Sequence, residues 1–71
     1  MTRTEILLEI LADLAEIGET RQPNSILKIE GDHYIMSRER GCQRHYLDIA
    51  STSPERLLAH WEGFCGRSFG A

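Results

Sequence analysis

The segment "SRERGCQRHY", residues 37–46, is the part of the chain with the most side chains that could do chemistry: three arginines, a cysteine, a histidine and a tyrosine. Cys42 and His45 are of the types that form a thiolate–imidazole pair for nucleophilic catalysis or ligate zinc. They are three positions apart in a segment that we expect to be extended, so their side chains should point to opposite faces. The arginines could instead hold phosphates while Tyr46 stacks on a base.

The rest of the sequence supports neither a metal site nor catalysis. His33, His60 and Cys65 are the remaining candidate ligands, and they complete no C-x-x-C or H-x-x-x-H pattern. No orienting acid or oxyanion-loop signature accompanies Cys42, and a chain of 71 residues has little room for a deep pocket. We therefore expect a protein that is not an enzyme and that has no metal and no cofactor.

Size and composition indicate a small globular protein. The 71 residues make one domain, 1–71, and two cysteines do not form a disulfide framework. The N-terminus lacks the features of a signal peptide, and no apolar run is long enough to cross a bilayer. We expect a cytoplasmic protein (in the host cytoplasm if it is phage-encoded) that does not bind membranes. A net charge of −3 argues against a general nucleic-acid binder.

Two segments have the pattern of amphipathic helices. The first, about residues 3–17, has an apolar stripe at helical spacing and is followed by Gly18. Thr2, with Glu5 in a capping box, or Thr4 would cap its start. The second, about residues 54–65, begins at "SP", a strong helix-start signal. We expect the tail 67–71 to be loose unless Phe69 docks on the core.

Three segments have the pattern of strands, at about residues 25–30, 33–39 and 43–50. "RQPNS" before them is predicted to be a turn. A two-residue Gly31-Asp32 loop would join the first two strands and pair Leu27 with Met36. The number of residues in the second loop decides which side chains of the last two strands face the core. An even loop (Arg40-Gly41, or residues 39–42) places Tyr34 opposite Leu47 on the core face, whereas a three-residue loop exchanges the faces. We favour the even loop.

The predicted order is α-β-β-β-α, an α+β fold in which two helices pack on one face of a three-stranded antiparallel sheet. This order resembles that of double-stranded-RNA-binding domains, and the resemblance implies an RNA-binding role. Those domains place lysines at the start of the last helix. The corresponding segment here reads "SPERLL", and the first helix is acidic. We therefore carry over no binding residue from the resemblance.

Two surfaces are candidate partner-binding sites. The first is an acidic stripe on the first helix, formed by Glu5, Glu9, Asp13 and Glu16. The second combines the uncovered sheet face, where Ile26, Ile35 and Tyr46 should be exposed, with the tip of the second hairpin. Its candidate residues are Lys28, Ile35, Arg38, Arg40, Arg44 and Tyr46. Apolar, aromatic and Arg side chains together are typical of contact sites.

The sequence therefore favours a protein–protein interaction protein, an inhibitor or regulator that docks on a larger complex. An acidic stripe would suit a complex with a basic nucleic-acid-binding groove. In size and charge alone the chain is similar to phage-encoded inhibitors, anti-CRISPR proteins among them. The alternative is a nucleic-acid-binding regulator that uses the basic hairpin. A third hypothesis is a homodimeric accessory protein.

Overall fold

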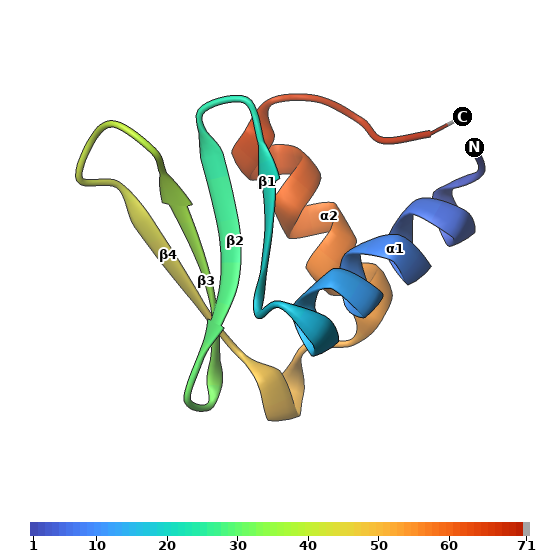
Figure 1. Ribbon diagram of the computed structural model, residues 1–71, viewed down its shortest axis with the longest axis horizontal. Helices are drawn as coiled ribbons and strands as arrows, with labels where there is room; N and C mark the ends of the chain where they lie inside the picture. Colours follow the sequence, from blue (N-terminus) through green and yellow to red (C-terminus); the bar gives the residue numbers. More distant parts are fainter. Residues whose placement is uncertain (71) are drawn as a thin grey trace.

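A computed structural model describes residues 1–70 and has an α+β fold (Figure 1). The elements are α1 (Arg3–Glu16), β1 (Glu19–Gln22), β2 (Ser25–Glu30), β3 (His33–Arg38), β4 (Arg44–Asp48), the 3₁₀ turn η1 (Ile49–Ser51) and α2 (Pro54–Cys65). The strands form an antiparallel meander in the order β1-β2-β3-β4, and both helices lie on one side of it (Figure 1). Within the described residues, no helix is long and apolar enough to cross a membrane.

The sheet has four strands, so the prediction of three strands was wrong. Pro23 and Asn24 do form the predicted turn, and Asn24 has the positive φ of 66° that the second central position of a type II turn requires. The four residues before this turn, "ETRQ", pair with β2 as the edge strand β1. They contain no apolar residue, so no alternation marks them as a strand. The extra strand also removes the match to the element order of double-stranded-RNA-binding domains.

The predicted registers of the other strands are confirmed. Leu27 is opposite Met36 in the β2–β3 pair, and Tyr34 is opposite Leu47 in the β3–β4 pair. The β3–β4 loop is the even, four-residue alternative of residues 39–42, closed where the Arg38 amide donates to the Gln43 carbonyl at 3.4 Å. This parity puts the larger apolar side chains of β2, β3 and β4 on the side of the helices.

The element ends follow local capping chemistry. The Thr2 hydroxyl accepts from the Glu5 amide (3.2 Å) at the start of α1, and Ser53 does the same for Arg56 (3.3 Å) in α2. α1 ends one residue earlier than predicted, and α2 has the predicted bounds. β4 ends at Asp48 rather than at residue 50, because the chain turns into η1 there.

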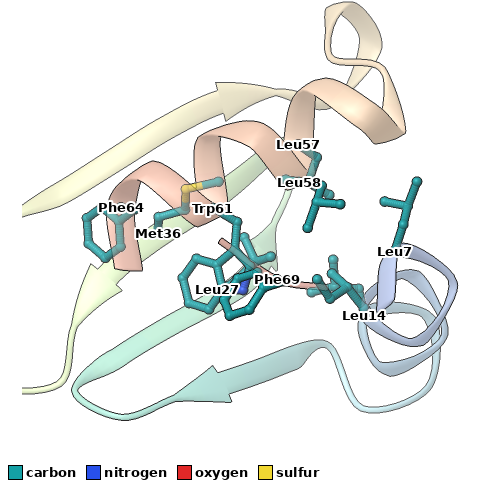
Figure 2. Packing of buried hydrophobic residues seen from close by; sticks show 10 residues of the cluster. Leu7, Leu14, Leu27, Met36, Leu57, Leu58, Trp61, Phe64 and Phe69 are labelled. Carbon is teal, nitrogen blue, oxygen red and sulfur yellow. The ribbon is translucent and has the colours of Figure 1, made fainter. Parts of the chain in front are cut away.

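The core lies between the helices and one face of the sheet (Figure 2). Its buried members are Leu7, Ile10, Leu14, Leu27, Met36, Leu57, Leu58, Trp61, Phe64 and Phe69. Trp61 is fully buried and stacks on Phe64 with 6.1 Å between ring centroids. The indole Nε1 of Trp61 is buried and has no hydrogen-bond partner among the described residues. Leu27 and Phe69 surround this ring in the cluster (Figure 2).

The C-terminal tail is docked at Phe69, which is the exception that the sequence prediction of a loose tail left open; Ala71 lies outside the described residues. Phe69 is 6% exposed, and its amide donates to Glu62 Oε2 at 2.7 Å. The same carboxylate forms an ion pair with Arg3, so Glu62 joins α2 to the tail and to the start of α1. Gly70 has φ +77°, and a Cβ there would lie 3.0 Å from the Arg3 backbone nitrogen. The tail therefore packs against α1 at a position suited to glycine.

We expect Phe69→Ala to lower the free energy of unfolding by about 3 kcal/mol, because truncating a buried Phe removes its burial and leaves a cavity. Urea unfolding followed by Trp61 fluorescence measures this loss. Ser68→Ala, at an exposed neighbouring position, is the matched control and should change stability by less than about 0.5 kcal/mol. Equal stability of the two variants would show that the tail does not dock.

Glu62 should make stability depend on pH. Its hydrogen bond from Arg3, aided by the Phe69 amide, lowers the pKa of Glu62 below its ordinary value of 4.5. A carboxyl with a lowered pKa in the folded state stabilises the fold above the unfolded value and loses this contribution as pH falls through the folded value. Glu62→Gln should therefore unfold at lower urea at pH 7, and the difference from the parent should shrink below about pH 4.5. A difference that stays constant down to pH 3 would contradict this role.

Candidate functional site

The face of the sheet opposite the helices was predicted to expose Ile35, and this was wrong. Ile35 does lie on that face, since it pairs with Lys28 and Tyr46 and not with core residues. It is nevertheless only 1% exposed. Ile35 lies on an inner strand, so the long side chains of Lys28 and Tyr46 lie on either side of it and exclude water. Ile26 on the same face is half-buried, whereas Tyr46 is 58% exposed as predicted.

The charged side chains around Ile35 are paired with one another. Glu30 accepts from Lys28 Nζ at 2.8 Å and from Arg44 Nη2 at 3.2 Å, and these cations lower the pKa of Glu30. The Arg44 guanidinium also lies 5.6 Å from the centre of the Tyr46 ring. Of the predicted contact residues on this face, Lys28 and Arg44 thus already have partners within the chain. A partner protein would have to replace these contacts.

Two further predicted residues, Arg38 and Arg40, lie elsewhere. Arg38, predicted as part of the basic hairpin, lies at the end of β3 with the same parity as Met36, so its side chain is on the helix side of the sheet. Its guanidinium lies 4.7 Å from the centre of the Phe64 ring and donates to Ser25 Oγ at 3.3 Å. Arg40 is exposed in the β3–β4 loop, as predicted for the hairpin tip. The six residues predicted as one sheet-and-hairpin surface therefore occupy three separate places.

The acidic stripe of α1 is arranged as the sequence predicts. Glu5, Glu9, Asp13 and Glu16 are all exposed. Across residues 1–70, no ion pair joins any of them to a Lys or Arg, and Arg3, the basic residue of α1, is bound to Glu62. The Thr2 hydroxyl donates to Glu5 at 3.2 Å, within the helix cap. α1 thus presents carboxylates that have no cationic partner in this part of the chain.

Beside these carboxylates lies an exposed apolar strip that the sequence reasoning missed. Leu8 is 60% exposed, and Ala12 and Ala15, which follow it at helical spacing, are exposed too. The sequence does indicate that Leu8 is exposed, since Leu8 falls outside the apolar stripe formed by Leu7, Ile10 and Leu14. We define the candidate docking surface as Leu8, Ala12, Ala15 and the four carboxylates. It combines an apolar strip with an acidic flank.

A second feature is an open groove of about 440 Å³ between the β3–β4 hairpin and α2. Its wall carries Arg38, Gln43 and His45 from the hairpin and Arg56, His60 and Phe64 from α2. His45 meets the Phe64 ring edge to face at 5.1 Å between centroids. No spacing in the sequence marks this groove, because its two sides are brought together only by the packing of α2 on the sheet.

The cysteines have different surroundings. Cys42 is exposed in the hairpin loop and Cys65 is half-buried at the end of α2, both as free thiols. Burial raises the pKa of the Cys65 thiol, opposed by a hydrogen bond with Ser25 and the charge of Arg38. Cys65 is therefore protonated at neutral pH, a poor state for a nucleophile.

Among residues 1–70, no three His, Cys, Asp or Glu side chains are grouped to hold a metal ion.

Comparisons with protein-family models, with curated proteins and with solved structures find no match to this chain.

The burial of Ile35 can be tested with a matched pair of substitutions in neighbouring strands. Ile35→Ala should lower the free energy of unfolding by about 3 kcal/mol, because the side chain is fully buried. Ile29→Ala removes the same atoms from a residue that is 39% exposed, and should cost about 1 kcal/mol. Urea unfolding measures both. A smaller loss at Ile35 than at Ile29 would mean that the outer face is open to water.

Proposed function

We propose that this chain is a non-catalytic protein-interaction protein that docks through α1 onto a basic surface of a larger protein complex and so inhibits or regulates it. One observation carries the proposal. The four carboxylates of the α1 stripe are exposed and have no ion pair with a Lys or Arg in residues 1–70, whereas Glu19 and Glu30, two of the three carboxylates in the strands, are ion-paired.

The unpaired carboxylates weaken the helix that carries them. Glu5, Glu9 and Asp13 follow one another at a spacing of four residues, and each like-charged pair at that spacing costs about 0.2–0.5 kcal/mol. No ion pair within the described residues offsets this cost. Features that break a local rule of stability without compensation are expected at functional sites. Lys or Arg side chains of a partner would remove the repulsion.

The docking surface also has the composition that such a contact needs. Leu8 and the two alanines offer apolar area to bury, which supplies affinity. The acidic flank would steer the approach and select a basic partner. A protein groove that normally holds nucleic acid carries the required positive charge, so blocking such a groove is a natural inhibitory role for this surface.

The geometry offers less support to the other hypotheses. Of the basic residues considered for RNA or DNA binding, Lys28 and Arg44 are engaged with Glu30. A homodimer through the outer sheet face would have to bury those same ion pairs, and removing paired charges from water is costly. We therefore advance docking through α1.

Charge reversal on α1 tests the proposal. Glu9→Lys with Asp13→Lys should abolish capture of a partner from lysate of the native host by the immobilised chain. Asp32→Lys with Glu55→Lys changes two exposed acids on other surfaces and raises the net charge equally, so it should capture the partner as the parent does. Binding of the purified partner should weaken as salt increases. Equal capture by both double variants would contradict docking through α1.

Two single variants sharpen the test. Glu9→Lys should raise the free energy of unfolding by about 0.8–2 kcal/mol, because it replaces two repulsive pairs, to Glu5 and Asp13, with attractive ones. It should weaken partner binding at the same time, so lost binding could not be explained by lost folding. Leu8→Ser should weaken binding with little change in stability, since Leu8 is exposed.

A further inference from the structure

The groove between the β3–β4 hairpin and α2 carries an inference that is independent of docking through α1. We propose that this groove binds the phosphate group of a small organic phosphate. Arg38 and Arg56 supply the charge, and His45, His60 and Gln43 line the same space. No Asp or Glu lines the groove, although acids outnumber bases in the chain by 11 to 8.

The two arginines of the groove are free to meet an anion. Arg3, Arg21, Lys28 and Arg44 each form an ion pair with a glutamate, whereas Arg38 and Arg56 form none with any residue of 1–70. Arg40 and Arg67 are likewise without an ion pair in this part of the chain, but neither lines the groove. Two guanidinium groups match the charge of a phosphate monoester dianion. A carboxylate would need only one of them, in a bidentate pair. The charge count therefore favours phosphate.

Arg38 is also held in place before any ligand arrives. Its guanidinium lies 4.7 Å from the centre of the Phe64 ring and donates to Ser25, which is 1% exposed. These contacts use one face and one edge of the planar group and leave its other N–H groups for an anion. Since Arg38 is already ordered, binding costs less side-chain entropy. Arg56, exposed in the first turn of α2, lines the same groove from the opposite wall.

The size of the groove indicates that the ligand is more than a free phosphate ion. Its volume of about 440 Å³ falls in the range of small-molecule sites, about 300–1,000 Å³. Ala59, Gly63 and Phe64 give one wall an apolar character on which an organic group could rest. The groove is open rather than deep, so we expect an affinity in the high micromolar to millimolar range.

Titration of the full chain with adenosine 5′-monophosphate, followed by two-dimensional amide NMR at low salt, tests the proposal. Amide shifts should concentrate on the hairpin and α2, with adenosine producing none and inorganic phosphate binding more weakly. Arg56→Gln should weaken binding about tenfold or more, as loss of a charge-assisted hydrogen bond does. Arg38→Gln should do likewise; Arg56 is the safer variant because its side chain is exposed. Arg40→Gln removes the same charge outside the groove and should leave binding unchanged.

Several outcomes would overturn the proposal. Equal weakening by Arg40→Gln and Arg56→Gln would show a general charge effect rather than a site. If adenosine binds as tightly as its monophosphate, the groove does not recognise the phosphate. If inorganic phosphate binds as tightly as the monophosphate, the organic group contributes nothing to binding. Binding of a single-stranded oligonucleotide without binding of the monophosphate would assign the groove to nucleic acid instead. Absence of shifts at 10 mM monophosphate would exclude the site.

Discussion

The parity of two hairpin loops controls the arrangement of this protein. A two-residue loop after β2 and a four-residue loop after β3 keep Leu27, Tyr34, Met36 and Leu47 on one face of the sheet. One residue more or fewer in either loop would move half of these side chains to the other face. Both helices can cover the sheet only because this apolar face is continuous, and Trp61 of α2 is buried against it.

Charged side chains on the surface are arranged in two ways, one on the outer face of the sheet and one on α1. On the outer face, Glu30 of β2 forms ion pairs with Lys28 of the same strand and with Arg44 of β4, and Lys28 lies directly opposite Ile35 of β3. On α1, the acids follow one another along one side of a helix, where the chain places no Lys or Arg against them in the described residues. Among residues 1–70, Arg38, Arg40, Arg56 and Arg67 form no ion pair, and Arg38 and Arg56 of these line the groove between the β3–β4 hairpin and α2. A small acidic chain thus carries an acidic surface and a basic groove at different places.

The position of α1 depends on the end of the chain. Glu62 accepts from Arg3 and from the Phe69 amide, so one carboxylate connects the start of α1, the middle of α2 and the tail. Phe69 then closes the core beside α1 and β1, with which it lines a small pocket. This arrangement aligns the docking surface of α1 away from the core. A domain of this size has few apolar residues to bury, so one docked aromatic side chain contributes a substantial part of its stability.

The features that the sequence determined are those set by local chemistry. Capping residues located both helices, Gly31-Asp32 set the first hairpin register, and apolar alternation selected the even second loop, because each of these signals acts over a few neighbouring residues. Helical spacing likewise placed the acids of α1 on one side.

Only the tertiary structure decided what non-local packing controls. β1 pairs through its backbone without an apolar pattern, and Ile35 is buried by long side chains of adjacent strands. Arg38 points to α2 and forms a groove with residues distant in sequence, and Phe69 is ordered because Glu62 and the core are there to receive it.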